Sequence, residues 1–215
     1  MDDSHSGSKL NRILGMPLVD RAIAIVALLP FALQIWWVLH APSIPVEYLL
    51  LVIVLAMLVV NLLIRRPPRR VTPNPLFWLI TFSVTYWPFY AAFFYTAGVR
   101  VAPAAVSITV SAVGVVISIW ARFSLGRNFG FVPAERQIVA SGAYRFVRHP
   151  IFTGIFILIV ANDLAAFSWR NLALSAIWVG LFVIKSLVEE SFLSESVEYS
   201  AYKSRVRWRW IPGLA

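Results

Sequence analysis

The sequence predicts an all-α integral membrane protein, a multi-span bundle of about six helices with a cytosolic loop and an amphipathic C-terminal tail. Two observations on composition point to this class. Of the 215 residues, 60% are apolar and only 13% are charged, and the mean hydropathy is +0.76. A soluble domain of this length has too little interior to bury so much apolar surface. The third observation is that the lysines and arginines gather in segments that separate long apolar runs.

The apolar runs define the expected helices. A helix needs about 20 mostly apolar residues to cross the hydrocarbon of a bilayer. We predict spans at residues 20–39, 46–64, 76–97, 101–121, 151–167 and 171–188. The last two are short and flank a polar turn, which is compatible with a helical hairpin. Alternating segments typical of membrane strands do not occur, and the first apolar run lacks a small-residue cleavage pattern, so we expect a retained helix.

Basic residues set the expected orientation. They fill the 65–75 linker, the 122–149 segment and the tail, whereas only Arg100 and Arg170 lie on the opposite side. The positive-inside rule then places both termini and the 122–149 segment in the cytosol. We therefore expect a multi-pass protein surrounded by membrane lipids.

Charge and cysteine content exclude other classes. The net charge of +9 would suit a nucleic-acid binder, but a soluble basic domain is not this apolar, so no nucleic-acid partner is expected. Cysteine is absent, which excludes disulfides, thiolate metal sites and a cysteine nucleophile. We name no metal ligands, and the sequence leaves the oligomeric state open.

One face of the fourth span carries small residues at helical spacing. Its members are Ala104, Ser107, Ser111, Gly114 and Ser118. Small side chains let helix backbones approach closely in lipid. We predict a packing seam here and assign it no chemistry.

The 122–150 segment ends in Arg148-His149-Pro150, where the fifth span begins. Proline suits the first turn of a helix, where its missing N–H costs nothing. Arg148 and His149 would then lie at the positive helix N-terminus, a place to hold an anionic group. The alternative is a basic membrane anchor that precedes a helix-starting proline.

A second polar cluster follows the sixth span. Lys185 and Glu189 are four residues apart on one helix face and can pair. Two adjacent carboxylates, Glu189 and Glu190, oppose the macrodipole at a helix C-terminus. The alternatives are a snorkelling lysine and a solvated helix end. The tail at 198–206 is amphipathic and basic, as expected of a helix lying on anionic headgroups.

Several motifs in the C-terminal half of the chain have the order and spacing found in one protein family. They are Gly142-x-Tyr144-x-x-x-Arg148-His149-Pro150-x-Phe152-x-Gly154, Glu189-Glu190-x-x-Leu193, Tyr199-x-x-Tyr202-x-x-Arg205-Val206 and Ile211-Pro212. Residues 120–212 thereby resemble the isoprenylcysteine carboxyl methyltransferase family, and phospholipid N-methyltransferases share a related signature. Within a single membrane domain, 1–215, we expect helices without a recognisable motif at 1–119 and a cofactor-binding catalytic region at 120–215.

The resemblance implies S-adenosylmethionine as the cofactor, bound between the C-terminal helices and the cytosolic loop. The cofactor-binding residues that it implies are Arg136, Gln137, Ile138, Val139, Tyr144, His149, Pro150, Ile151, Phe152 and Glu189. Glu189 matches the acid that binds the polar end of the cofactor, and Lys185 stands where the family typically has a substrate-contacting arginine. Phe152 replaces the usual tyrosine, and the stretch after Leu193 is two residues short. These departures from the family pattern bear on the identity of the substrate more than on the identity of the cofactor.

The expected reaction is methyl transfer to a carboxylate of a lipid-like or prenylated acceptor. A carboxylate is already ionised at neutral pH, so basic side chains need only orient it. An amine acceptor would need a base, for which Glu190 and His149 are candidates. The catalytic candidates are Arg148, Lys185, Glu190 and Arg205. The alternatives are phospholipid N-methylation and a sterol-reductase-type enzyme that uses NADPH, whose Arg-His-Pro signature is similar.

Overall fold

The computed structural model describes residues 16–40, 46–92, 94 and 96–214 of the chain. The polar N-terminal segment and the loop between the first two predicted spans lie outside the described residues. The helices are α2 (Pro17–Leu39), α3 (Val46–Ile64), α4 (Pro75–Ala92), α5 (Ala104–Leu125), α6 (Pro150–Ala165), α7 (Trp169–Leu193) and α8 (Val197–Arg205). The predicted all-α character is confirmed, because helices make up most of the described chain.

Each predicted span corresponds to one of the helices α2 to α7. Within the described residues, two helical segments are long and apolar enough to cross a membrane, at Ala104–Asn128 and Trp169–Leu193, and α6 is a shorter apolar helix. Length and composition therefore support a membrane protein. The six-span topology and its cytosolic orientation stay predictions.

Helix α7 extends farther than we predicted. It runs to Leu193 instead of ending near residue 188, so the Glu189-Glu190 pair lies within its last two turns. Cations from other elements surround Glu190, and they offset the unfavourable position of a carboxylate near a helix C-terminus. At the other end the Ser168 side chain accepts a hydrogen bond from the Asn171 N–H at 3.0 Å, which caps the helix.

A two-residue antiparallel strand pair was not predicted. It joins β1 (Arg70–Val71) to β2 (Ala134–Glu135). Prolines on both sides of β1 keep this linker out of a helix, and its backbone bonds to a segment over 60 residues away. The Arg69 N–H donates to the Glu135 carbonyl at 2.8 Å, and the Arg66 N–H donates to the Arg127 carbonyl at 2.7 Å.

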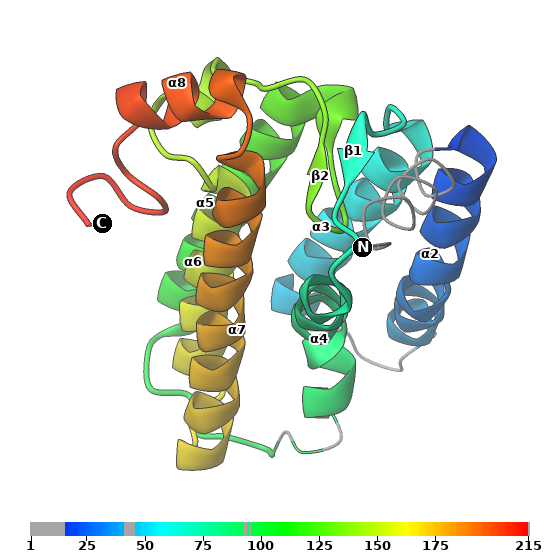
Figure 1. The fold of residues 1–215 in the computed structure, drawn as a ribbon. Helices are drawn as coiled ribbons and strands as arrows, with labels where there is room; N and C mark the ends of the chain where they lie inside the picture. The colour runs from blue at the N-terminus through cyan, green and yellow to red at the C-terminus, as the bar shows by residue number, and fades with distance from the viewer. Residues whose placement is uncertain (1–15, 41–45, 93, 95, 215) are drawn as a thin grey trace.

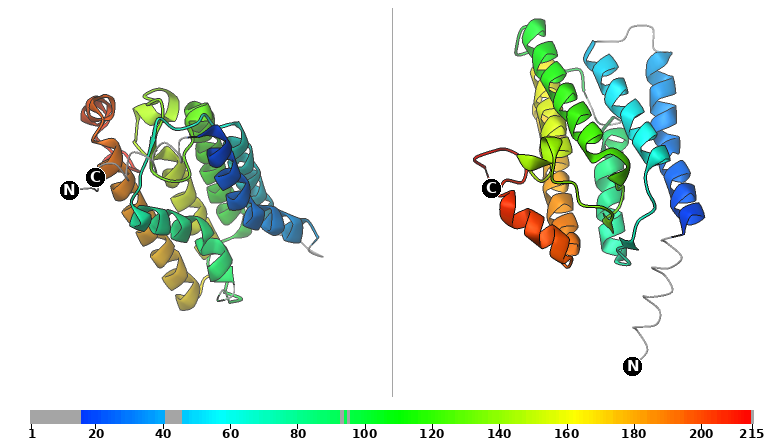
Figure 2. Two further views of the ribbon diagram at one scale, coloured as in Figure 1. Left: turned by 45° about the vertical axis from the view of Figure 1, so that its right-hand side comes forward. Right: turned by 90° about the horizontal axis from the view of Figure 1, so that it is seen from above.

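The six long helices form a closed ring. Helix α2 packs on α3, α3 on α5, α5 on α6, α6 on α7, and α7 on α4. The ring closes where Tyr86 of α4 donates its hydroxyl to the Ala27 carbonyl of α2 at 3.0 Å. Figures 1 and 2 show α2 and α3 on one side of the bundle and α5, α6 and α7 on the other.

The small-residue face of α5 is a packing seam, as predicted. Ser107, Ser111 and Ser118 are buried on it. Opposite lies Gly154 of α6, where an added Cβ would come within 2.2 Å of the Ser118 Oγ and 2.7 Å of the Gly114 carbonyl oxygen. Only glycine permits this approach of the two backbones.

The basic segments meet at one end of the bundle. Helix α8 and the β1–β2 pair both lie at this end (Figure 1). Arg70 of β1 forms an ion pair with Glu195, between α7 and α8. The 65–75 linker, the 122–149 loop and the tail therefore share one end, as the charge pattern requires of segments on the same side of a membrane.

Candidate functional site

The helix ring encloses a cavity of about 860 Å³. This volume lies within the range of roughly 300–1,000 Å³ that is typical of ligand pockets. Every ring helix contributes to the wall, through Phe31, Leu58, Trp87, Arg122, Phe152 and Phe182, among others. The cavity extends from Ala165 at one end of α6 to Tyr202 of α8 at the basic end of the bundle.

The two parts of the cavity differ in chemistry. The wall toward the middle of the bundle is mostly apolar, with Val54, Val84, Leu158, Ile159 and Trp178, although Arg100, Asn162 and Ser175 also line the cavity away from the basic end. Charged and phenolic side chains line the part near the basic end, namely Arg122, Arg136, Tyr144, Arg148, His149, Lys185 and Glu189. An amphiphile with a polar head and an apolar body would match this division.

The cavity brings most of the predicted site residues together. All predicted cofactor-binding residues except Pro150 line it, as do Arg148 and Lys185 from the catalytic set. Pro150 is the first residue of α6, as predicted. Glu190 lies behind the wall and contacts Arg148 and His149. The cofactor-binding and catalytic roles themselves stay predictions.

Arg205 lies away from the cavity. Its side chain is exposed on α8, and its Nε donates to the Ala201 carbonyl of the same helix at 3.3 Å. The structure therefore does not bring it together with the other catalytic candidates.

Lys185 and Glu189 form the predicted pair across one turn of α7. Lys185 Nζ lies 3.2 Å from Glu189 Oε2 and 5.3 Å from the centre of the Phe152 ring. The lysine side chain is buried, so it does not reach toward headgroups as a snorkelling lysine does. Glu189 stays accessible from the cavity, with its side chain 27% exposed.

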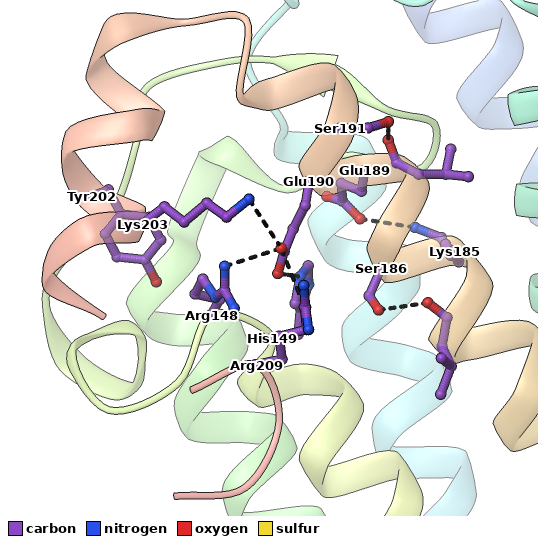
Figure 3. Close-up of polar contacts among 12 residues, drawn as sticks. Arg148, His149, Lys185, Ser186, Glu189, Glu190, Ser191, Tyr202, Lys203 and Arg209 are labelled. Carbon is purple, nitrogen blue, oxygen red and sulfur yellow. Dashed lines mark hydrogen bonds and ion pairs between the residues drawn. The ribbon is translucent and has the colours of Figure 1, made fainter. Parts of the chain in front are cut away.

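Glu190 is the centre of an ion cluster (Figure 3). Its carboxylate accepts hydrogen bonds from Arg148 Nη1 at 3.0 Å and Arg209 Nε at 3.3 Å, and it lies 3.1 Å from His149 Nε2. Lys203 Nζ is 3.8 Å away, and the carboxylate side chain is only 3% exposed. We predicted that Arg148 and His149 would suit an anionic group, and the anion that they hold is a side chain of α7.

The C-terminal tail closes over the start of α6. Beyond α8, the Trp208 carbonyl accepts from the Arg148 N–H at 2.9 Å, and the Arg209 carbonyl accepts from the His149 N–H at 2.8 Å. Arg148 Nη2 also donates to the Arg207 carbonyl at 3.2 Å. The tail therefore fixes the backbone of two cavity-lining residues.

Helix α8 packs on protein through one face, and its predicted contact with headgroups stays a prediction. Tyr199 and Tyr202 are buried and pack against Tyr144, and the Tyr202 hydroxyl donates to the Tyr144 carbonyl at 2.8 Å. Burial is the main factor that raises the pKa of all three phenols, and the nearby carboxylates Glu189 and Glu190 raise it further.

Sequence reasoning missed Arg122, which we counted only as part of the basic 122–149 segment. It is 4% exposed and lines the cavity. A signal was present, because Arg122 follows Ser118 by one helical turn and continues the buried face of α5. Arg136 is buried nearby, and its pKa is lowered to about 10, chiefly by burial and then by the charge of Arg65.

Comparison with known protein families matches part of the chain. Residues 102–199 match the phospholipid methyltransferase family model, which is slightly less than half of the chain. No curated protein matches the chain. The matched segment runs from the start of α5 into α8, so it holds most of the polar wall of the cavity. The segment 102–199 is therefore similar to the phospholipid methyltransferase family.

Proposed function

We propose that the chain is an S-adenosylmethionine-dependent membrane methyltransferase that acts on a carboxylate of a lipid-like acceptor. The observation that carries the proposal is the single cavity in which the polar residues of the matched segment face an apolar compartment between helices. An acceptor with an apolar body would reach the polar end without leaving the bilayer.

The residues of the polar end fit the cofactor. Glu189 presents a carboxylate to the cavity, which suits the ammonium of the methionine part. The aromatic ring of Phe152 and the apolar side chains of Ile138 and Val139 offer surfaces for an adenine ring. When bound, S-adenosylmethionine would supply a methyl group attached to a sulfonium; the nucleophile would attack the methyl carbon in line with the C–S bond, and the thioether would leave.

The chain contributes orientation and exclusion of water. Lys185 and Arg148 carry charges that would hold an acceptor carboxylate in place. The tail and α8 cover the basic end of the cavity through the contacts of Trp208 and Tyr202. A covered site keeps water from competing with the acceptor.

The ion cluster favours a carboxylate acceptor over an amine. An amine must lose a proton before it attacks, and a basic group has to take it; ion pairing with cations makes a carboxylate a weaker base. Glu190 is engaged by Arg148, His149 and Arg209, and Glu189 by Lys185. A carboxylate acceptor needs no such base because it is already ionised at neutral pH.

Phospholipid N-methylation is the second candidate, and the match to the phospholipid methyltransferase family favours it. A phospholipid acceptor would also fit the apolar compartment. No observation on the described residues favours the reductase alternative, since the matched family transfers methyl groups.

Two measurements test the proposal. Calorimetry in detergent should detect binding of S-adenosylhomocysteine, and Glu189→Gln should weaken it about ten- to a hundredfold, because a charge-assisted contact is worth roughly 1.5–3 kcal/mol. The matched control is Glu198→Gln, which changes an exposed carboxylate of α8. Equal affinity in the Glu189 variant would remove this residue from the cofactor site.

The second measurement identifies the acceptor class. Membranes containing the protein are incubated with cofactor that carries a tritiated methyl group. Label in base-labile esters supports carboxylate methylation, and label in base-stable N-methyl lipids supports the second candidate. Absence of both transfer and S-adenosylhomocysteine binding would overturn the methyltransferase proposal.

A further inference from the structure

Two buried arginines on the cavity wall lack the partners that such groups require. Arg122 is 4% exposed and Arg136 is 5% exposed, and both line the polar part of the cavity. Burying an unpaired charge costs several kcal/mol, so buried cations are normally paired with anions. The ion pairs and hydrogen bonds of each arginine therefore show whether the protein itself satisfies the buried charge.

Arg122 has no counter-charge. In the described part of the chain its guanidinium makes no hydrogen bond or ion pair, and its Nε and Nη1 are buried without a partner. The Phe129 ring lies close to it, with its centre 5.5 Å from the guanidinium carbon. An aromatic face attracts a cation but does not satisfy its N–H groups.

Arg136 shares a carboxylate that is already occupied. Asp20 accepts two hydrogen bonds from Arg65, at 2.9 and 2.7 Å, and lies 3.6 Å from Arg136 Nη2. Arg136 Nε donates to a backbone carbonyl, that of Arg66, at 2.9 Å. Its Nη1 is buried without a partner. Two arginines thus share the carboxylate of Asp20, and the charge of Glu189 also acts on Arg136.

One short loop contacts both arginines. The Phe129 ring contacts Arg122, and the next residue is Gly130, where an added Cβ would lie 2.8 Å from Arg136 Nη1. The side-chain oxygen of Asn128, in the same loop, is also buried without a partner. The absence of a side chain at Gly130 therefore lets the Arg136 guanidinium lie against the backbone of this loop.

We infer that Arg122 and Arg136, in addition to Lys185 and Arg148, bind the anionic headgroup of the acceptor, a phosphate or a carboxylate on a membrane amphiphile. This inference rests on the proposed function, since it names the class of its acceptor. An anion in the polar part of the cavity would neutralise the unpaired charge of Arg122 and accept hydrogen bonds from the free N–H groups of both arginines. The apolar compartment that adjoins them would take the hydrocarbon part, so a neutral or purely cationic lipid is a poor acceptor.

The test uses the full-length protein in a neutral detergent and paired lipid probes. Dioleoyl phosphatidic acid is compared with dioleoylglycerol, and oleate with oleyl alcohol, by native mass spectrometry and by the shift in melting temperature. We expect an anionic probe to bind at least about tenfold more tightly than its neutral counterpart. The pair that shows the larger ratio identifies phosphate or carboxylate as the preferred headgroup.

Arg122→Met should abolish this preference while Arg122→Lys retains part of it. Without ligand, Arg122→Met should raise the melting temperature, because it removes an uncompensated buried charge, whereas a structural arginine would lower it. Gly130→Ala is a second variant, which displaces the Arg136 guanidinium and should also weaken binding of the anionic probe. The control is Arg145→Met, an exposed arginine whose guanidinium carbon lies 4.5 Å from the centre of the Phe146 ring.

Two results would overturn the inference. One is equal binding of the anionic and neutral probes by the wild-type protein. The other is a parallel loss of S-adenosylhomocysteine affinity in Arg122→Met, which would assign the arginine to the cofactor carboxylate instead. A wild-type protein that prefers the anionic probes but does not bind S-adenosylhomocysteine would leave the anion site standing and refute the proposed function.

Discussion

Glu190 Oε2 lies 3.0 Å from Arg148 Nη1, and both side chains are at most 5% exposed. This contact joins the end of α7 to the residue pair that precedes α6. Since Arg148 also donates to the Arg207 carbonyl, the ion pair holds the C-terminal tail in place. Loss of this ion pair should therefore lower the stability of the fold and also loosen the C-terminal tail that covers the cavity.

We predict that Glu190→Gln lowers the free energy of unfolding by roughly 3–5 kcal/mol, because it leaves the buried Arg148 without its anion. Thermal unfolding in detergent measures this. Glu198→Gln is the control, since Glu198 lies 3.8 Å from an exposed arginine and surface pairs contribute at most about 1 kcal/mol. Equal melting temperatures for the two variants would show that the ion cluster does not stabilise the fold.

The seam between α5 and α6 yields a second prediction. Gly154→Ala places a Cβ within 2.2 Å of the Ser118 Oγ and 2.7 Å of a backbone oxygen, so the helices must separate. Overpacking of this kind costs about 1–3 kcal/mol. Gly180→Ala on α7 meets nothing within 4 Å and should be neutral or slightly stabilising. If both variants melt alike, the close approach of the two helices is not as described.

The three buried phenols predict a pH dependence. Burial raises the pKa of Tyr144, Tyr199 and Tyr202 above the ordinary value near 10. The folded state then retains protons that the unfolded state loses, so the stability that these groups contribute is complete below about pH 10 and is lost as the pH rises above it. Absorbance titration should show these phenolates forming only as the protein unfolds. Replacement of each tyrosine by phenylalanine should remove amplitude from that late phase, and ionisation of all seven tyrosines near pH 10 would refute the assignment.

A fourth prediction concerns topology. Helix α7 has 25 residues and is about 37 Å long, enough to cross a hydrocarbon layer of about 30 Å. Trp169 and Val197 are exposed near opposite ends of it. Because the chain has no native cysteine, Trp169→Cys and Val197→Cys can be labelled singly with an impermeant maleimide. Label should reach the first from outside intact cells and the second only after permeabilisation; access to both from one side would contradict a spanning α7.

Hydropathy was sufficient to predict the helices, because a long apolar segment in lipid has to satisfy its backbone hydrogen bonds within itself. The seam on α5 was also predictable, since side-chain size and helical spacing define a face without knowledge of its neighbour. Pairings between distant segments were not. The contacts of Arg148 with Glu190 and with the tail join residues 42 and 59 positions apart, and local patterns do not encode such distances.

The role of Arg122 shows the same limit for the candidate site. A charge count assigned it to a solvated basic segment, which is where arginines that flank apolar helices usually lie. Its burial depends on how α5 is rotated against α6, and on the loop at 128–130 that folds beneath it. The rotation of α5 and the path of the loop both depend on tertiary contacts, which local sequence patterns do not reveal.

Because the helix ring closes between Tyr86 and Ala27, segments from both halves of the chain form the cavity wall. The segment that is similar to the family supplies most of the polar wall, but α2, α3 and α4 supply much of the remaining wall of the same cavity. A fragment restricted to 102–199 would thus leave the cavity open on one side, with its polar residues exposed to lipid or detergent. Substitutions in the first three helices can reshape the cavity, and so alter which molecules enter, while every side chain of the polar wall is kept.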